Sequence, residues 1–363
     1  MMRILFCGGG TAGHVNPAIA VAQTVERNMP DSKIAYVTTM NGIENSIVAY
    51  KKFKIDVIGF KRSFCRENFK FFTKLISAKK QCLRILEEFH PDVIFGTGGY
   101  ATYPVIVAGR ELGIKTILHE SNVVPGKATL ALEKKLDKIL VNFKESEKYF
   151  KGKTKIIHTG NPIRVFPTFD KVSCIKEKLG IKTKYVILCT GGSLGATRIN
   201  DSALEIADNL VRYSEDITLI WSTGKNHYDE VKNSIKSRGL MLGERIIVKD
   251  YFDNLLEYIC ISDVVISRSG AMTISELAIM KKCAILVPSP NVTNNHQLKN
   301  ARALERKEAA VLLTEDQLYK IVDITKDLIS NYELRENLSA NIEKFSIKNA
   351  NKRIYDEIVD LIN

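Results

Sequence analysis

The chain carries the same pattern near its beginning and near its middle: an apolar run, a glycine-rich turn and then an amphipathic stretch. The two copies read RILFCGGGTAGH (3–14) and YVILCTGGSLGA (185–196). Short apolar runs alternate with amphipathic stretches along most of the remaining chain, which is typical of strand–helix units that build a parallel sheet. The sequence therefore predicts an α/β protein with two Rossmann-like halves.

Strands are expected at the apolar runs, with helices between them, and only helices are expected from about residue 316 onward. In the first half the runs are 3–6, 34–39, 55–60, 92–96, 115–120, 138–143 and 155–160, and in the second half they begin at 185, 217, 245, 263, 283 and 309.

A polar stretch with a proline, VFPTFDKVSCIKEKLGIKTK (165–184), interrupts this pattern. A length of 363 residues also exceeds what one hydrophobic core usually covers. We therefore expect an N-terminal domain over 1–164, a C-terminal domain over 165–345, and a last helical segment, 346–363, that packs back on the N-terminal domain.

Cysteine usage and charge limit the environment and the partners. The seven cysteines are scattered and never in C-x-x-C spacing, which argues against a disulfide framework or a zinc site and favours a reducing cytoplasm. No apolar run reaches the roughly 18 residues that span a bilayer, and the chain begins with a strand rather than a signal peptide. A net charge of +12 points to an anionic partner: nucleic acid, a phosphorylated small molecule or anionic lipid.

The first turn satisfies G-x-G-x-x-G, the spacing that seats a pyrophosphate on a helix N-terminus in dinucleotide-binding proteins. A nicotinamide cofactor would also need an acidic residue about 20 positions later, at the end of the second strand. Thr38, Thr39, Met40 and Asn41 stand there instead. The dinucleotide interpretation is therefore disfavoured, and we expect no cofactor. A turn that only packs its helix closely remains an alternative.

Further polar or glycine-rich clusters follow other expected strands: GTGGY (96–100), HESN (119–122), TGNPIR (159–164), GGSLGA (191–196), SRSGAMTISE (267–276) and NNHQLKNA (294–301). In open parallel sheets, ligands bind at the carboxyl ends of the strands. Glu276 falls two turns inside a helix that Ser269 and Gly270 open, which suits a carboxylate that accepts ribose hydroxyls. The alternative is an ordinary glutamate on a helix surface, which burial statistics favour.

In this order and approximate spacing the motifs resemble the MurG family, N-acetylglucosaminyltransferases of glycosyltransferase family 28, from about residue 3 to about 345. The resemblance implies a GT-B fold, two Rossmann-like domains around a central cleft. It also implies an inverting transfer of GlcNAc from UDP-GlcNAc to the 4-hydroxyl of MurNAc in undecaprenyl-pyrophosphoryl-MurNAc-pentapeptide, which converts lipid I to lipid II in peptidoglycan synthesis. The enzyme would be peripheral on the cytoplasmic face of the bacterial membrane.

The resemblance also assigns roles to residues of this chain. The C-terminal domain would bind the donor, with Glu276 on the ribose, the backbone of Phe252 on the uracil edge and Gln297 on the sugar hydroxyls. The donor-binding set is Arg164, Gly191, Gly192, Ser193, Gly195, Phe252, Ala271, Met272, Thr273, Glu276, His296 and Gln297. The set around the acceptor and its diphosphate is Thr11, Ala12, Gly13, Tyr100, Asn122 and Asn200.

His14 is the candidate general base, because an unperturbed imidazole has a pKa of about 6.5 and accepts a proton near neutral pH. A diphosphate-binding role for His14 stays open, and Glu120 is the second candidate base. Three residues depart from the family pattern. Ala12 replaces a glycine, which would cost about 1 kcal/mol if the position needs positive φ. Ser121 and Leu194 replace glutamines and take no role here.

No protein-held metal is expected, because the chain contains no D-x-D motif and its six histidines show no ligand spacing. We expect the departing UDP to be stabilised by helix N-termini and backbone N–H groups of the C-terminal domain, with Arg164 adding a formal charge.

Residues 51–84 contain eleven Lys or Arg and two acidic residues, interleaved with Phe64, Phe69, Phe71, Phe72, Leu75 and Ile76. A basic amphipathic helix with an aromatic face can lie in an anionic headgroup layer. We therefore expect residues 60–84 to contact the membrane. The alternative is a helix that packs on the core and exposes a solvated basic side.

Three other functions remain open. One is another UDP-sugar lipid transferase of the same fold, such as a diacylglycerol glycosyltransferase. The second is a UDP-GlcNAc epimerase. The third is a non-enzymatic module that binds a nucleotide sugar or nucleic acid. The sequence lacks RNP, zinc-finger and helix-turn-helix signatures, so no nucleic-acid partner is expected.

Overall fold

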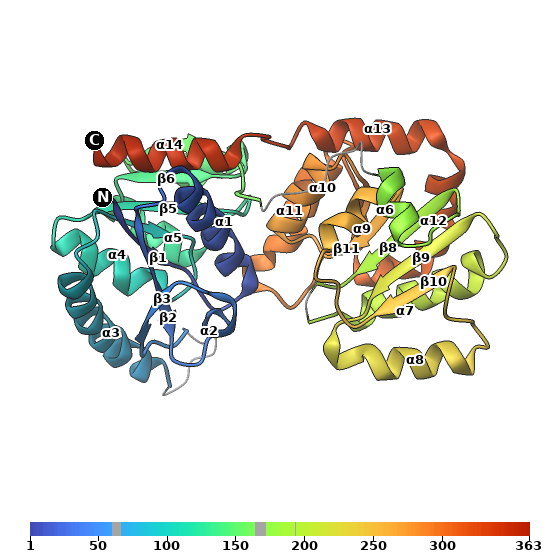
Figure 1. The fold of residues 1–363 in the computed structure, drawn as a ribbon, viewed down its shortest axis with the longest axis horizontal. Helices are drawn as coiled ribbons and strands as arrows, with labels where there is room; N and C mark the ends of the chain where they lie inside the picture. The colour runs from blue at the N-terminus through green and yellow to red at the C-terminus, as the bar shows by residue number, and fades with distance from the viewer. Residues whose placement is uncertain (60–66, 164–171, 193) are drawn as a thin grey trace. The chain divides into compact units, whose positions relative to one another are not determined.

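The computed structural model describes residues 1–59, 67–163, 172–192 and 194–363, apart from the side chains of 67–70, 72 and 293. The chain forms two compact units (Figure 1). The first unit comprises Met1–Arg164 together with Ile347–Asn363, and the second comprises Val165–Ser346.

A parallel sheet forms the centre of the first unit, in the order β3-β2-β1-β4-β5-β6-β7. Its strands are β1 (Arg3–Cys7), β2 (Lys33–Thr39), β3 (Lys51–Ile55), β4 (Val93–Gly96), β5 (Lys115–Glu120), β6 (Lys138–Val141) and β7 (Lys155–His158). The order reverses between β1 and β4, which pair in parallel from Ile4 with Val93 to Cys7 with Gly96. At such a reversal the chain leaves neighbouring strands in opposite directions, so an open crevice forms at their carboxyl ends.

Helices cover both faces of this sheet, which explains why its central strands are continuous apolar runs. The helices of this unit are α1 (Ala12–Asn28), α2 (Glu44–Ile47), α3 (Glu67–Phe89), α4 (Thr102–Glu111), α5 (Lys127–Leu132) and α14 (Ala350–Ile362). Leu5 and Ile94 face a core shared with Leu86 of α3 and Ile106 of α4. On the other face, Ile4 and Phe95 pack with Val21 of α1.

The C-terminal helix α14 belongs to the first unit and lies beside α1 (Figure 1). Its fully buried Ile354 and Ile358 complete the core on the α1 face. Lys138 at the start of β6 donates hydrogen bonds of 2.7 Å to Glu357 Oε2 and 2.6 Å to Asp360 Oδ2. These contacts fix α14 to the sheet by apolar burial and by charge.

The second unit has a parallel sheet in the order β10-β9-β8-β11-β12-β13. The strands are β8 (Tyr185–Thr190), β9 (Ile217–Ser222), β10 (Ile246–Lys249), β11 (Val264–Ser267), β12 (Cys283–Leu286) and β13 (Val311–Leu312). The order reverses between β8 and β11, so the crevice expected of this topology lies at their carboxyl ends. The fully buried Trp221 of β9 is the largest side chain in the core.

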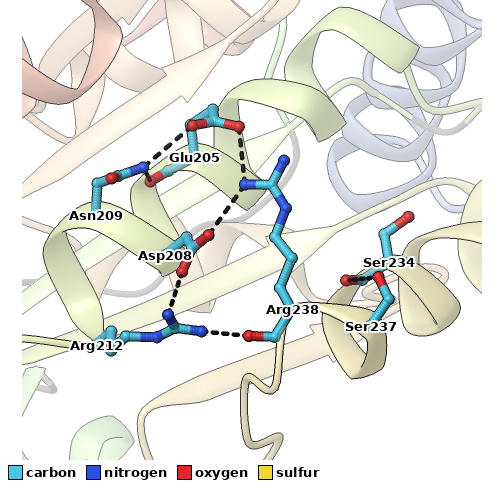
Figure 2. Close-up of polar contacts among 7 residues, drawn as sticks. All are labelled: Glu205, Asp208, Asn209, Arg212, Ser234, Ser237 and Arg238. Atoms are coloured by element: carbon cyan, nitrogen blue, oxygen red, sulfur yellow. Dashed lines mark hydrogen bonds and ion pairs between the residues drawn. The ribbon is translucent and has the colours of Figure 1, made fainter.

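The helices of the second unit are α6 (Val172–Lys178), α7 (Thr197–Ile206), α8 (Tyr228–Ser237), α9 (Leu255–Ile261), α10 (Ala271–Ile279), α11 (His296–Glu305), α12 (Ile321–Ser330) and α13 (Tyr332–Glu343). A π-helical turn, η4 (Ala207–Val211), continues α7. Figure 2 shows how ion pairs join this turn to the end of α8: Arg238 contacts Glu205 at 2.9 Å and Asp208 at 3.2 Å. Arg212 contacts Asp208 at 2.8 Å and donates to the carbonyl oxygen of Arg238.

The prediction of an α/β fold with two Rossmann-like halves is confirmed, and most strands fall where apolar runs predicted them. The strand expected at 55–60 is the exception, since β3 covers Lys51–Ile55. β3 is the edge strand of its sheet, so its side chains alternate between exposed lysines and the buried Phe53 and Ile55. The apolar run at 55–60 was a wrong prediction, because an edge strand alternates between exposed and buried side chains and is not apolar throughout.

Candidate active site

Two glycine turns interlock at the carboxyl edge of the first sheet, where β1 and β4 end. Thr97 Oγ1 donates a 2.6 Å hydrogen bond to the carbonyl oxygen of His14. Gly99 has φ +81°, and a Cβ there would lie 2.3 Å from the carbonyl oxygen of Gly9. The absence of a side chain at Gly99 therefore allows one backbone turn to approach the other.

His14 lies in the first turn of α1, half-buried, above these glycines. Its Nδ1 is 3.2 Å from the carbonyl oxygen of Gly9 and 3.2 Å from Thr11 Oγ1. A carbonyl oxygen only accepts, so the tautomer that satisfies both contacts carries its proton on Nδ1. Nε2 then holds the lone pair. The ring edge lies over Gly98, where a Cβ would be 3.4 Å from Nε2.

The structure removes the strain expected at Ala12. Ala12 is the first residue of α1 and does not have positive φ, while Gly10 before it does, at +87°. Thr11, in an extended conformation, is the N-cap, and Thr11 and Gly13 are exposed. The expected acceptor residues Thr11, Ala12 and Gly13 therefore form the exposed N-terminus of a 17-residue helix.

Tyr100 closes over the same turn. Its Cε1 would lie 2.9 Å from a Cβ at Gly10, so the ring packs directly on the glycine with the left-handed backbone. The half-buried Tyr100 thus joins Thr11 and His14 around one turn.

Glu120 is buried, with 5% of its surface exposed, and its carboxylate braces the loop after β5. Oε1 accepts hydrogen bonds from the backbone N–H of Asn122 at 3.0 Å and from Asn122 Nδ2 at 3.2 Å. Oε2 accepts from Gly126 N at 3.0 Å and Thr129 Oγ1 at 2.8 Å. These four donors hold the carboxylate within the loop. This geometry favours a bracing role for Glu120 and leaves His14 as the better candidate base.

His119 precedes Glu120 and is fully buried. Its Nε2 lies 2.9 Å from the carbonyl oxygen of Gly160, which connects the end of β5 to the segment after β7. Burial lowers the pKa of His119 to about 4, so this imidazole is neutral and structural.

Glu44 is a buried carboxylate that the sequence analysis missed. None of its surface is exposed, and Oε1 accepts from Thr39 N at 2.9 Å and Thr39 Oγ1 at 2.6 Å. Oε2 lies 3.5 Å from the backbone nitrogen of Gly10. An acidic residue was expected at 38–41 for a dinucleotide site, and Glu44 stands only three residues beyond. The sequence signal was Gly42-Ile43-Glu44, shortly after β2 ends at Thr39. The turn at Gly42 allows the Glu44 side chain to reach back to the strand end.

The second unit carries a similar turn after β8. Gly192 and Gly195 have φ values of +85° and +77°, and Gly195 N donates to the carbonyl oxygen of Gly192 at 3.0 Å. A Cβ at Gly195 would lie 2.0 Å from the carbonyl oxygen of Thr223, and one at Gly191 would lie 2.5 Å from Ala196 N. The turn therefore packs tightly before α7 begins. Ser193 and Arg164, both expected donor contacts, lie outside the described residues.

The β11 turn opens α10, as the sequence predicted. Ala271, Met272 and Thr273 form its first turn, and Glu276 lies half-buried farther along the helix. Ser269 Oγ donates to the carbonyl oxygen of Gln297 at 2.9 Å, and Asn300 Nδ2 donates to the carbonyl oxygen of Ser269 at 3.3 Å. These bonds bring the start of α11, with His296 and Gln297, to the start of α10.

Gln297 has a fixed amide orientation. Its Oε1 accepts a 2.8 Å hydrogen bond from Ser289 N, so Nε2 is the group that the side chain can offer to a ligand. Asn294 and Asn295, directly before α11, both have left-handed backbones, with φ of 55° and 49°. Such strain in non-glycine residues is concentrated at functional sites.

Phe252 follows β10 with its side chain turned inward. The ring is 3% exposed and its centroid lies 4.2 Å from that of Tyr258. Burial of the ring fixes the backbone of this loop. The backbone of Phe252, and not its ring, was expected to contact the uracil edge.

Asn200 lies in α7 of the second unit and is 5% exposed. Its Nδ2 donates to the carbonyl oxygen of Thr223 at 3.1 Å, and its Oδ1 accepts from Trp221 Nε1 at 2.9 Å. Both ends of the amide hold the start of α7 to the end of β9, so the polar atoms of Asn200 have a structural role.

Among the described residues, no group of three or more His, Cys, Asp or Glu is arranged to hold a metal ion. Of the helices in the described ranges, none combines the length and apolarity needed to cross a membrane.

Two parallel-sheet units with glycine turns at the reversal of strand order define the class: a GT-B fold. A solved structure of Acinetobacter baumannii MurG aligns with a TM-score of 0.77 and 24% identity, covering 99% of this chain and 100% of that one. Residues 4–141 match the glycosyltransferase family 28 N-terminal domain, and residues 186–354 match its C-terminal domain. The chain belongs to glycosyltransferase family 28.

Curated relatives are similar over almost their whole length. A protein of Caldicellulosiruptor saccharolyticus is 37% identical, covering 99% of both chains, and one of Acetivibrio thermocellus is 36% identical, covering 99% of this chain and 98% of its own. Both are named UDP-N-acetylglucosamine–N-acetylmuramyl-(pentapeptide) pyrophosphoryl-undecaprenol N-acetylglucosamine transferase.

Proposed function

We propose that this protein is a hexosyltransferase that moves GlcNAc from UDP-GlcNAc to the 4-hydroxyl of MurNAc in undecaprenyl-pyrophosphoryl-MurNAc-pentapeptide. The product is lipid II, the disaccharide precursor of peptidoglycan. The observation that carries the proposal is the identity of 36–37%, over 98–99% of either chain, with relatives that bear the name of this reaction.

The acceptor binds the first unit, around the N-terminus of α1. The acceptor oxygen attacks C1 of GlcNAc from the side opposite UDP, so the bond from C1 to the diphosphate breaks as the new glycosidic bond forms, and the anomeric centre inverts. Nε2 of His14 takes the hydroxyl proton, because the Gly9 contact holds the ring proton on Nδ1. Tyr100 and Asn122 position the acceptor sugar and diphosphate.

The donor binds the second unit, at the glycine turns that open α7 and α10. The backbone N–H groups at these helix N-termini stabilise the negative charge that gathers on UDP as the bond breaks. Arg164 and Ser193 add contacts to the diphosphate, Glu276 accepts the ribose hydroxyls, and the backbone at Phe252 reads the uracil. Gln297 Nε2 donates to a sugar hydroxyl, since its Oε1 is held by Ser289.

The test is transfer of labelled GlcNAc to a short-chain lipid I analogue by the purified protein. The expected product is a disaccharide-linked lipid whose formation requires both UDP-GlcNAc and the muramyl lipid. Transfer to diacylglycerol but not to the lipid I analogue would identify a different lipid transferase. Conversion of UDP-GlcNAc without any acceptor would identify an epimerase.

The acceptor lipid requires contact with a membrane, and we assign that contact to residues 60–84 on the cytoplasmic face. The described part of this segment is in α3, where Ile76 is 62% exposed and Phe71 and Leu75 are half-buried. Lys74 pairs with Asp56 and Lys79 with Glu111, so part of the basic charge of α3 is balanced locally. The remaining cations attract anionic headgroups, by about 1 kcal/mol each.

Liposome flotation tests this surface. We expect binding to vesicles that contain phosphatidylglycerol, and a severalfold loss with Ile76→Ser or with Phe71→Ser and Phe72→Ser together. Tyr319→Ser is the matched control, because Tyr319 is also exposed, at 78%, but lies in the second unit. Equal flotation of all variants would exclude α3 as the membrane surface.

A further inference from the structure

One peptide group lies between a buried carboxylate and the candidate base. The carbonyl oxygen of Gly9 is 3.2 Å from Nδ1 of His14. The N–H of the same peptide, carried by Gly10, points to Glu44 Oε2 at an N–O distance of 3.5 Å. Glu44, the Gly9–Gly10 peptide and His14 therefore form one chain of hydrogen bonds.

The surroundings hold Glu44 in this arrangement. The carboxylate is fully buried, and two donors from Thr39 fix Oε1. A Cβ at Gly9 would lie 2.9 Å from Glu44 Oε1, and one at Gly42 would lie 2.0 Å from it. The backbone at Gly9 and at Gly42 thus lies so close to the carboxylate that a side chain at either position would clash with it.

A second contact fixes the same turn from the sheet. Tyr36 OH donates a 2.7 Å hydrogen bond to the carbonyl oxygen of Gly8, the residue before the shared peptide. Glu44 and Tyr36 therefore hold consecutive peptide groups of the turn, and the Gly9 carbonyl is left directed at His14.

We propose that Glu44 is a positioning residue that raises the basicity of His14 through the Gly9–Gly10 peptide, deepening the proposed function. A negative charge beside the N–H polarises the peptide and makes its carbonyl oxygen more negative. The more negative oxygen strengthens the bond from Nδ1–H, and that bond stabilises the imidazolium that forms when Nε2 takes a proton. Glu44 thus acts as an orienting carboxylate does in an acid–base pair, with one peptide group in between.

Other titratable groups around His14 act differently. The carboxylate of Glu120 accepts a 2.8 Å hydrogen bond at Oε2 from Thr129 Oγ1, within its own loop. Tyr100 packs on Gly10. Tyr36 and Cys7 are buried, and burial raises the pKa of both, so these two side chains are neutral near pH 7. Glu44 and Glu120 are therefore the carboxylates to separate by experiment.

The direct test measures the pKa of His14 by NMR of histidine-labelled protein without substrates. The His14 signal is assigned by its loss in His14→Ala. Glu44→Gln keeps the shape and can still accept from Thr39, but it removes the charge beside Gly10. We expect the pKa of His14 to fall by about 0.5 to 1 unit in this variant. Glu133→Gln is the matched control, because Glu133 is also buried and accepts a glycine N–H, from Gly152, elsewhere in the unit. We expect no shift there.

An unchanged His14 pKa in folded Glu44→Gln overturns the proposal, and so does an equal fall in Glu133→Gln. A fall with Glu120→Gln alone would transfer the role to Glu120. If Glu44→Gln does not fold, the unmodified protein provides the test. The chemical shift of the Gly10 amide nitrogen must then change with pH at the same midpoint as His14. A pH-independent shift of Gly10 overturns the proposal.

Activity gives the second readout. In the transfer assay, the acid limb of the kcat/KM profile should move to lower pH in Glu44→Gln by the same amount as the NMR pKa. An NMR shift without any transfer by the unmodified protein would retain the relay and reject the proposed reaction.

Discussion

The indole nitrogen of Trp221 donates a 2.9 Å hydrogen bond to Asn200 Oδ1 inside the second unit. Trp221 is the single tryptophan of the chain and is fully buried in the centre of that unit. Its fluorescence therefore reports on the second unit alone, and its hydrogen bond couples the probe to the turn that precedes α7.

Asn200→Ala should destabilise the second unit by about 2 kcal/mol, because it leaves the buried indole N–H without an acceptor. Urea unfolding followed by Trp221 emission measures this change. Asn209→Ala is the control: Asn209 is exposed on η4, so its loss should stay within about 0.5 kcal/mol. Equal midpoints for the two variants would contradict the structural role of Asn200.

His14→Ala should lower kcat by about 10²- to 10⁴-fold, the usual contribution of a positioned base. The dissociation constant of UDP should stay unchanged, since the donor residues other than Arg164 belong to the second unit. Single-turnover transfer and calorimetry with UDP measure the two effects. A loss of acceptor affinity with unchanged kcat would instead make His14 a diphosphate ligand.

Glu276→Gln should weaken UDP binding by about 10- to 100-fold, because a carboxylate that accepts two ribose hydroxyls contributes roughly 1.5 to 3 kcal/mol. Calorimetry with UDP and with 2′,3′-dideoxy-UDP measures the contact, and the variant should bind both ligands alike. Glu305→Gln, at the exposed end of α11, is the control. If the native protein binds the two nucleotides equally, Glu276 is an ordinary surface glutamate.

The first unit should lose stability between pH 6.5 and pH 4. Burial lowers the pKa of His119 to about 4, so in that range the unfolded chain binds a proton that the folded chain does not. The free energy of unfolding therefore falls as the pH falls, by at most about 3 kcal/mol. Hydrogen exchange of β5 and β7, corrected for intrinsic rates, measures the loss. His119→Gln keeps a donor for Gly160 and should flatten this dependence; an equally steep profile would assign it to other groups.

Transfer should continue in the presence of a chelator, because helix N-termini and Arg164 are expected to stabilise the departing diphosphate. The assay compares initial rates with EDTA, with magnesium and with neither. Activity lost in EDTA and restored only by magnesium would contradict the proposed leaving-group stabilisation.

Local sequence patterns predicted the fold well, because buried parallel strands are apolar without interruption. The run KTILHE coincides with β5, Lys115–Glu120. Edge strands carry a weaker signal, and β3 was displaced for that reason. The turn glycines were visible in the sequence, but whether a glycine admits a ligand or a second backbone depends on distant residues, as Gly99 and Gly9 illustrate.

Side-chain partnerships were harder to predict than motifs. Glu120 and Asn200 are in motifs that suggest ligand contact, yet both use their polar atoms within their own unit. Glu44 is in no recognised motif and became visible only when the strand end and the glycine turn were placed together. Side-chain hydrogen bonding in the folded chain decides these roles, and periodicity carries no information about it.

The return of α14 to the first unit has a consequence for synthesis on the ribosome. Ile354 and Ile358 complete the core beside α1, but they are translated after the whole second unit. The unit that emerges first therefore cannot bury its α1 face until the ribosome has passed residue 358. During that interval nascent chains expose an apolar stripe, a natural site for a chaperone.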